Sequence, residues 1–313
     1  MNDTAPALST YRPSHKFEAG GVARMLSIVI PAGLGIGALY GVIAWYIPLV
    51  YLTCLALAGA AFFIGVVVIK ASQDANNRNP PLAFLAGAVA GLAALYAAWV
   101  LWIAALSGWQ AWFFNPVDLF GIATELLEDG VWSIGSSGQP VTGVFLATVW
   151  IIEALTLVAA PAVLAYLSTR NTPYIESIGQ WATEKATYLP LAHYDKPART
   201  ALASRLAAGE AEALAELRPA DDPEAGYSQA TFNYSDADDS QQFLTLETVT
   251  PPKKKDQRPK TDLICRNLLI DRDGRQAIER VLADHNVDEA PAPDPQAHSA
   301  TPAAEADPDR PSV

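Results

Sequence analysis

Residues 25–69 have the sequence MLSIVIPAGLGIGALYGVIAWYIPLVYLTCLALAGAAFFIGVVVI and contain no charged side chain. As a single α-helix this stretch would measure about 67 Å, roughly twice the ~30 Å hydrocarbon core of a bilayer. It must therefore fold back on itself. Trp45 and Pro48 mark the turn, because proline interrupts helical hydrogen bonding and tryptophan favours the lipid–water interface. The stretch predicts two antiparallel spans, residues 25–46 and 49–69.

Two more apolar stretches follow, at about residues 82–106 and 141–167, and each is long enough to cross a bilayer with some tilt. Only eight charged residues occur in the whole of residues 25–167. A chain with so apolar a first half needs lipid as its solvent. The sequence therefore predicts an α-helical polytopic membrane protein with four transmembrane helices and a retained first span.

The basic residues lie on one side of these spans. Residues 1–24 and the loop between the second and third spans contain Lys and Arg, and residues 168–313 contain 16 more. The segment from 107 to 140 has none, but has four acidic residues. The positive-inside rule then predicts that both termini are cytoplasmic. Because the chain is rich in Ala and poor in Lys, we expect a GC-rich bacterium and its inner (cytoplasmic) membrane.

Small residues recur at helical spacing in two spans. Gly33, Gly37 and Gly41 form a GxxxGxxxG row in the first span, and Gly87 and Gly91 repeat the spacing in the third. Small residues let helix backbones approach closely in lipid. The row could form a dimer face between protomers, or it could pack inside one bundle. The second interpretation is preferred, since the spacing is common in apolar segments.

The external segment contains a short helix of its own. Asn115 and Pro116 are typical of a helix start, and Gly130 is typical of a helix stop. Apolar residues recur between them at helical spacing, so we expect an amphipathic helix at the outer interface. A lid on the bundle is the preferred role, and a ligand-sensing loop is the alternative.

Glu153 is the one charged side chain expected deep inside a span. A carboxylate near the bilayer midplane costs about 2.5–3.5 kcal/mol on insertion scales. No Lys, Arg or His lies in the other spans, so an internal ion pair is excluded. Glu153 is therefore either a proton or cation site, or a neutral group that hydrogen-bonds between helices. The polar candidates to surround it are Tyr40, Thr53, Cys54, Tyr96, Thr148 and Thr156.

The second half of the chain predicts a small α+β domain. Its expected elements are a helix-like juxtamembrane segment at 168–190, a helix at 198–217, strands at 231–234, 242–249 and 263–270, and a helix at 271–282 capped by Asp271. This domain would cover residues 168–285. Residues 286–313, rich in Pro, Ala and Asp, are expected to be disordered.

Lys253, Lys254 and Lys255 form a basic cluster between the last two predicted strands. The cluster is either a solvated hairpin tip, which is preferred, or a weak contact for anionic lipid. Residues 168–313 carry 16 basic against 25 acidic residues, so nucleic acid is not expected as a partner.

Known catalytic and metal-binding patterns are missing from the sequence. It contains no GxGxxG, GxxxxGK[ST], GxSxG or HExxH motif. Cys54 and Cys265 are far apart, and the four histidines have no ligand spacing. We therefore expect no catalytic residue, no metal and no cofactor.

Two segments carry a resemblance. The stretch YGVIAWYIPLVYL at residues 40–52, followed by two further spans and a tail, resembles uncharacterised bacterial four-helix integral membrane proteins with a YIPxxY-type hairpin and a cytoplasmic tail. The segment PYIESIGQW at 173–181 is similar to a PxCExCxxW segment of such proteins, with Ile175 and Ile178 in place of the cysteines. The resemblance implies no known activity.

Three functions are compatible with the sequence. The first is a non-enzymatic membrane anchor, scaffold or sensor that couples the bundle to the cytosolic domain. The second is a proton or small-cation transporter or channel centred on Glu153. A membrane-bound enzyme is the third and has the least support. The expected partners are membrane lipids and either further copies of the chain in a homo-oligomer or another membrane protein.

Overall fold

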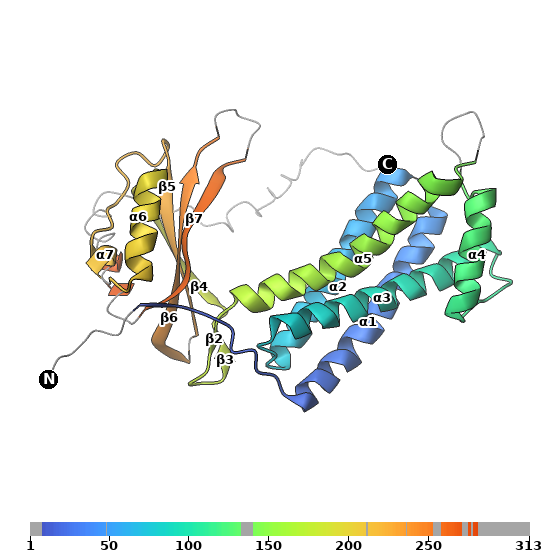
Figure 1. The fold of residues 1–313 in the computed structure, drawn as a ribbon, viewed down its shortest axis with the longest axis horizontal. Helices are drawn as coiled ribbons and strands as arrows, with labels where there is room; N and C mark the ends of the chain where they lie inside the picture. Colours follow the sequence, from blue (N-terminus) through green and yellow to red (C-terminus); the bar gives the residue numbers. More distant parts are fainter. Residues whose placement is uncertain are drawn as a thin grey trace, which may run out of the picture.

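A computed structural model shows two parts, a bundle of long helices and a strand-rich domain (Figure 1). The structure describes residues 8–47, 49–132, 140–210, 212–235, 237–252, 258–270, 275–276 and 278–280. Pro48, Lys253, Lys254, Lys255, Asp271 and residues 286–313, for which expectations were stated above, lie outside the described residues.

Four helices of the bundle are long and apolar enough to cross a membrane, which confirms the predicted number of spans. They are α1 (Ala19–Tyr46), α2 (Val50–Asp74), α3 (Pro80–Leu106) and α5 (Gly143–Asn171). Each extends beyond its predicted span at the end nearer the strands. On α1, α2 and α5 these extensions include the first charged residues beyond the apolar stretch, Arg24, Lys70 and Arg170.

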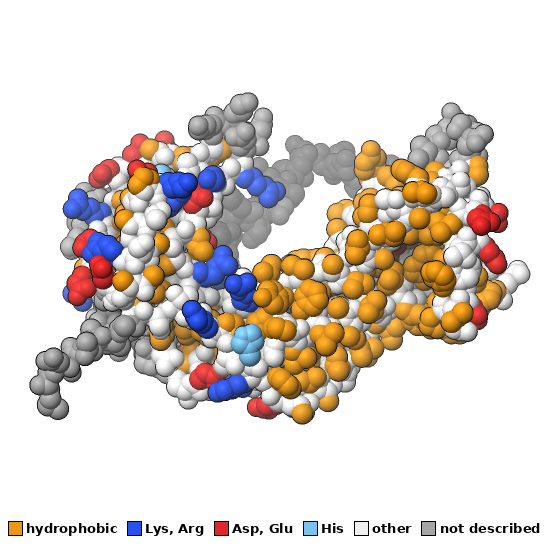
Figure 2. Space-filling model, viewed as in Figure 1, with side chains coloured by type: hydrophobic (Ala, Val, Ile, Leu, Met, Phe, Trp, Pro, Cys, Tyr) orange, Lys and Arg blue, Asp and Glu red, His pale blue; other side chains and the backbone are white. Residues whose placement is uncertain are grey.

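The four long helices close into a ring, in which α1 contacts α3, α3 contacts α5, α5 contacts α2, and α2 contacts α1. Helix α3 is the most deeply placed, and its alanines fill the centre of the bundle: Ala83, Ala90 and Ala94 are completely buried. Larger apolar side chains point outward and cover the bundle surface, whereas charged side chains gather over the strand-rich domain and at the bundle ends (Figure 2).

Helix α4 (Pro116–Asp129) lies across the end of the bundle remote from the strands (Figure 1). Its predicted start and stop are confirmed. The Asn115 side chain accepts a hydrogen bond from the Val117 backbone N–H at 3.0 Å, and Gly130 ends the helix with a φ of 79°. Leu119 is buried against Val100 of α3, so α4 packs onto the bundle as a cover.

The juxtamembrane segment differs from the expectation. Its predicted helix-like character is wrong beyond Asn171, where α5 ends. Thr172 is extended because it precedes Pro173, whose ring disfavours helical backbone in the preceding residue. The chain then forms the hairpin of β2 (Tyr174–Ile175) and β3 (Gln180–Trp181), followed by β4 (Glu184–Leu191).

The larger sheet has the order β1-β7-β6-β5-β4, and all of its pairs are antiparallel. The three predicted strands lie within β5 (Tyr227–Ser235), β6 (Asp238–Thr250) and β7 (Lys260–Ile270), whereas β4 was not expected. Helices α6 (Lys196–Ala207) and α7 (Glu212–Ala215) cover one face; they replace one predicted helix, which breaks at Gly209 with a φ of 87°. The buried core between helices and sheet includes Leu206, Phe232, Leu244 and Leu246.

The N-terminal segment belongs to this sheet. The sequence predicts no strand within residues 1–24, but Ser9 and Thr10 form strand β1 and pair with Leu269 and Leu268 of β7. The chain thus enters the sheet, crosses to the bundle, makes four spans and returns to the same sheet (Figure 1). We refer to β1–β7, α6 and α7 as the sheet domain.

Candidate functional site

Glu153 lies on α5 and is partly buried. Its carboxyl group forms a side-chain hydrogen bond with Tyr40 of α1, whose side chain is almost fully buried. Helices α1 and α5 occupy opposite corners of the bundle, so the contact crosses the bundle interior. This hydrogen bond partly offsets the cost of placing a carboxyl group in an apolar environment.

Cys54 of α2 interacts electrostatically with Tyr40, whereas the four remaining polar candidates bond elsewhere. Thr148 and Thr156 donate to the Val144 and Ile152 carbonyls, one turn earlier on their own helix, at 2.8 and 2.7 Å. Thr53 donates to the carbonyls at the start of α2, and Tyr96 donates to the Phe114 carbonyl. Helical threonines commonly bond back to the preceding turn. Fewer polar residues therefore surround Glu153 than the sequence predicted.

The glycine rows contact helices of the same chain. A Cβ on Gly33, Gly37 or Gly41 would overlap the backbone of Ala90, Ala94 or Ala98 on α3. Likewise, Gly87 and Gly91 face the backbone of α5 at Ala162 and Leu157. These glycines let α1, α3 and α5 pack backbone to backbone inside the bundle. The same surfaces are thus occupied and do not face a second copy.

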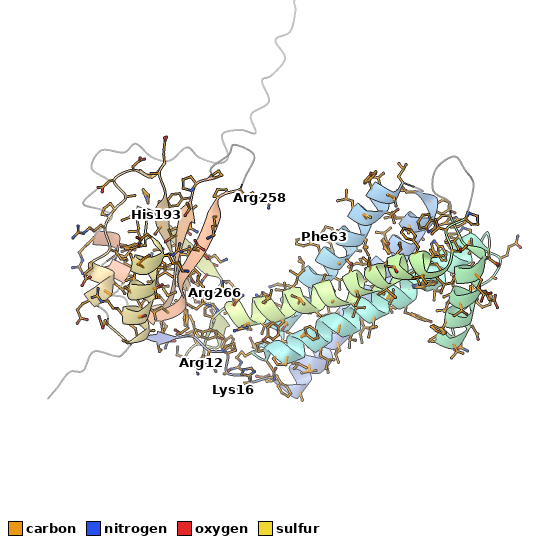
Figure 3. All side chains as sticks on the ribbon, turned by 45° about the horizontal axis from the view of Figure 1, so that its top comes forward. Arg12, Lys16, Phe63, His193, Arg258 and Arg266 are labelled. Carbon is orange, nitrogen blue, oxygen red and sulfur yellow. The ribbon has the colours of Figure 1, made fainter. Side chains whose placement is uncertain are left out.

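A dense set of polar contacts joins the bundle to the sheet domain. We call it the junction and define it by Lys16, Arg78, Asn171, Tyr174, Glu176, Trp181 and Asn267. Figure 3 shows this region, where Lys16 lies between the two parts.

At one side of the junction, Arg78 in the α2–α3 turn meets the hairpin that follows α5. Its guanidinium donates to the Glu176 carboxylate at 2.7 Å, and its Cζ atom lies 4.5 Å from the centre of the Tyr174 ring. The Lys16 ammonium lies 3.8 Å from the same carboxylate. Two cations thus flank one carboxylate, and the Tyr174 ring packs on the guanidinium of one of them.

Glu176 is ionised more readily than an ordinary glutamate. Its partial burial opposes ionisation, but hydrogen bonding from Ser14 and the charges of Arg78 and Lys16 outweigh that effect and lower the pKa of Glu176. The carboxylate is therefore charged at neutral pH and available to both cations.

The hairpin also docks through Trp181. The Trp181 Nε1–H donates to the Gln73 carbonyl of α2 at 3.1 Å, and its ring packs edge to face on Tyr174 with centroids 5.1 Å apart. Ile175 and Ile178, which stand where the resembling segment has cysteines, pack with Ala182 in a small apolar cluster. Apolar packing thus stabilises this hairpin at both positions.

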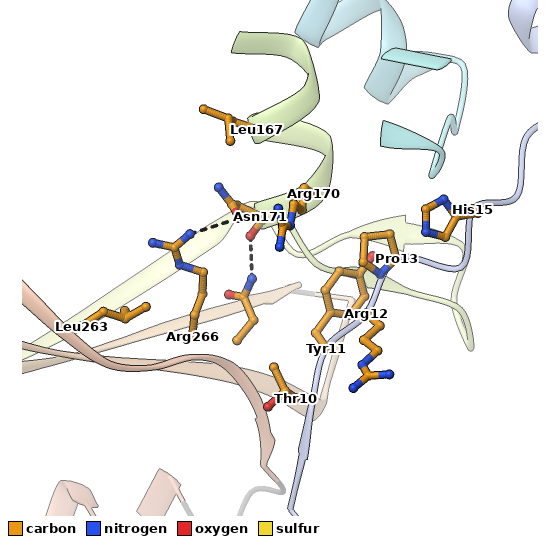
Figure 4. A pocket seen from close by; sticks show the side chains of 11 residues that line it. Thr10, Tyr11, Arg12, Pro13, His15, Leu167, Arg170, Asn171, Leu263 and Arg266 are labelled. Atoms are coloured by element: carbon orange, nitrogen blue, oxygen red, sulfur yellow. Dashed lines mark hydrogen bonds between the residues drawn. The ribbon is translucent and has the colours of Figure 1, made fainter. Parts of the chain in front are cut away.

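The other side of the junction depends on a bulge in β7. Thr245 of β6 faces two residues of β7, Arg266 and Asn267, because Leu244 pairs with Leu268 and Leu246 with Cys265. Asn267 adopts a φ of 49° and donates its side-chain N–H to the Asn171 carbonyl at 2.7 Å. Arg266 donates to the Asn171 side-chain oxygen at 3.2 Å (Figure 4). The bulge thereby turns a strand residue toward the end of α5.

The junction supplies orientation rather than a reacting group. Its contacts are ion pairs, amide hydrogen bonds and aromatic packing, which hold two bodies in one geometry. Sequence reasoning did not select these residues. One signal was present: PYIESIGQW contains both Glu176 and Trp181, and these two side chains dock the hairpin on the bundle.

Comparisons with known proteins give no relative. No protein-family model, no curated protein and no solved structure matches the chain.

Proposed function

We propose that the protein is a non-enzymatic membrane anchor that holds its sheet domain against the end of the four-helix bundle, so that a change in one part reaches the other. The distribution of Lys and Arg supports a cytoplasmic sheet domain, with both termini on that side, in a bacterial inner membrane. In this arrangement the bundle serves as a scaffold or sensor and the sheet domain as its output.

The observation that carries this proposal is the junction. It connects the N-terminal segment, the α2–α3 turn, the end of α5 and strand β7 through Lys16, Arg78, Asn171 and Asn267. A domain that is only tethered would need one covalent linker. Here every chain segment at this end of the bundle contacts the sheet domain or its hairpin, so rotation of a helix end would be transmitted to the sheet.

A homo-oligomer or a complex with another membrane protein would use surfaces outside the glycine rows. Those rows are filled by contacts within the chain. The outer faces of α2 and α5 remain apolar and open, with Leu55, Phe63 and Leu155 at least 60% exposed. Lipid covers such faces in the monomer, and a partner helix would replace it.

Distances between the two parts test the anchor. Spin labels at Lys70→Cys on α2 and Thr200→Cys on α6, in full-length protein with Cys54 and Cys265 changed to Ala, report the separation in lipid nanodiscs. We expect one narrow distance distribution, which Glu176→Ala broadens. A broad distribution in the protein with an intact junction would show a loose tether and overturn the proposal.

A proton or small-cation path centred on Glu153 is the second candidate, favoured by the Tyr40–Glu153 contact. It has weaker support because Thr53, Thr148 and Thr156 bond to their own helices. Flux into proteoliposomes decides between the two. A flux that Glu153→Gln abolishes and Tyr40→Phe reduces would establish the path; equal, background-level rates for all three proteins would exclude it.

A further inference from the structure

A cavity of about 620 Å³ opens beside the junction, between the N-terminal segment, the end of α5 and strand β7. Arg170 and Arg266 lie on either side of Asn171, and Arg12 and His15 lie on the neighbouring N-terminal segment (Figure 4). The described residues that line the cavity include no Asp or Glu. It is therefore strongly cationic.

The charges of these arginines are not neutralised by the protein. In the part of the chain that the structure describes, Arg12, Arg170 and Arg266 form no ion pair. Other arginines in this protein do pair with carboxylates: Arg78 with Glu176, Arg199 with Asp262, and Arg205 with Glu216. Figure 2 shows Lys and Arg side chains gathered where the apolar surface of the bundle ends. Their positive charge suits an anionic ligand.

Exposed apolar residues of α5 adjoin the cavity. Leu167 lines it and is 43% exposed, and Val163 and Leu164, one turn earlier on α5, are exposed at 44% and 37%. These residues form a partly exposed apolar strip on α5 that ends at the cavity. A ligand that fits the whole site has an anionic head and an apolar chain.

We propose that the cavity binds the phosphate headgroup of an anionic phospholipid from the leaflet on the sheet side. Arg170 and Arg266 hold the phosphate oxygens, since a guanidinium presents paired N–H donors that match a phosphate. The acyl chains lie along Val163, Leu164 and Leu167. A free phosphate would use the same arginines but would leave this strip unoccupied.

The site goes beyond the proposed anchor function and stands on different contacts. It shares Asn171 and Asn267 with the junction, but neither Arg78 nor Glu176 lines it. A broad distance distribution with lipid binding intact would thus count against the anchor alone, and a narrow one with no lipid bound would count against the lipid site alone.

Native mass spectrometry tests the site. Full-length protein is extracted from nanodiscs that contain equal amounts of phosphatidylglycerol and phosphatidylcholine. We expect one phosphatidylglycerol retained per chain, in preference to phosphatidylcholine. Arg170→Gln should lower this retention roughly tenfold, the loss of one charge-assisted contact. Arg170→Lys should retain an intermediate amount, because it keeps the charge but loses the paired donors.

Arg24→Gln is the matched control, since Arg24 is an exposed arginine on α1 outside the cavity. It should leave retention unchanged. Equal loss in the Arg24 and Arg170 variants would indicate general surface attraction and overturn the site, as would equal retention of the two lipids. Binding of inorganic phosphate that Arg170→Gln abolishes, with no phosphatidylglycerol retained by the wild type, would assign the cavity to a soluble phosphate and overturn the lipid. The spin-label distances of each variant verify that it is folded.

Discussion

Arg78 donates a 2.7 Å hydrogen bond to Glu176, a residue 98 positions further along the chain. The arginine side chain is 12% exposed and the glutamate 46%, so the pair is half shielded from water. It closes a loop that contains both α3 and α5. Arg78 belongs to the bundle and Glu176 to the sheet domain. The pair therefore helps to fix the position of one part relative to the other.

The first prediction concerns the strength of this pair. A double-mutant cycle with Arg78→Ala and Glu176→Ala should give a coupling free energy of about 1 kcal/mol, at the upper end for partly exposed pairs. Lys70 and Asp74, an exposed pair on α2, are the control and should give about 0.3–0.5 kcal/mol. Thermal unfolding in detergent measures both. Equal values would mean that the junction pair contributes no more than a surface pair.

The second prediction concerns acid. Because the folded-state pKa of Glu176 lies below its ordinary value of about 4.3, ionised Glu176 stabilises the junction. This stabilisation is present above the ordinary pKa and is lost as the pH falls through the lowered one. The distribution of distances between the two parts should stay narrow above the ordinary pKa of about 4.3 and broaden as the pH falls through the lowered pKa of Glu176. In the Glu176→Gln variant the distance distribution should be broad at every pH. If that variant instead shows the same transition in acid, groups other than Glu176 cause the transition.

A third prediction tests the glycine row. Gly37→Val should destabilise the bundle by about 1–3 kcal/mol or more, because the new side chain overlaps the Ala94 backbone. Gly35→Val is the matched control, since no atom lies within 4 Å of its added Cβ. Scanning fluorimetry and gel filtration of both variants measure the effect. A stable Gly37→Val protein that changes only its oligomeric state would instead place the row between protomers.

The fourth prediction separates backbone strain from hydrogen bonding at Asn267. Asn267→Gly should lose the side-chain bond to Asn171, at about 1 kcal/mol. Asn267→Ala loses the same bond and keeps a Cβ at a φ of 49°, where an alanine costs roughly 1–2 kcal/mol more than a glycine. Thermal unfolding should therefore rank the Asn267→Gly variant above the Asn267→Ala variant. The reverse order of the two variants would exclude left-handed strain at the bulge.

Thiol labelling gives the fifth prediction. Burial raises the pKa of Cys265 to about 11, although a hydrogen bond with the Leu246 backbone acts in the opposite direction. The thiol is thus protonated at pH 8, and in a Cys54→Ala background it should react with iodoacetamide roughly two orders of magnitude more slowly than an ordinary cysteine. Unfolding should restore the ordinary rate. Rapid labelling of the folded protein would show that β7 opens at this position.

Much of the membrane part could be predicted from local sequence. A 45-residue run without charge cannot lie in water or cross ~30 Å only once, so residues 25–69 had to form two spans. Asn115 and Gly130 marked the ends of α4, because caps satisfy backbone groups of neighbouring residues. These features depend on residues close in sequence and on the dimensions of lipid.

The site depended on residues far apart in sequence, which local patterns do not encode. Tyr40 reaches Glu153 only because α1 and α5 stand at opposite corners of one bundle, whereas Thr148, also a candidate, bonds to its own helix. The packing of small residues sets the order of the helices in the ring. The hydrophobic pattern of the sequence is compatible with several such orders.

The sheet shows the same division. Alternation identified β5, β6 and β7, but not that Ser9 and Thr10 complete their sheet or that Asn267 forms a bulge that bonds to Asn171. Which strands pair depends on which edge of the sheet is free, and β1 takes the free edge of β7. The bulge depends on a partner within reach of Asn267, here the Asn171 carbonyl. The sequence by itself determined the spans and the strand-forming segments; only the tertiary structure decided which of them meet, because those contacts form after the whole chain has packed.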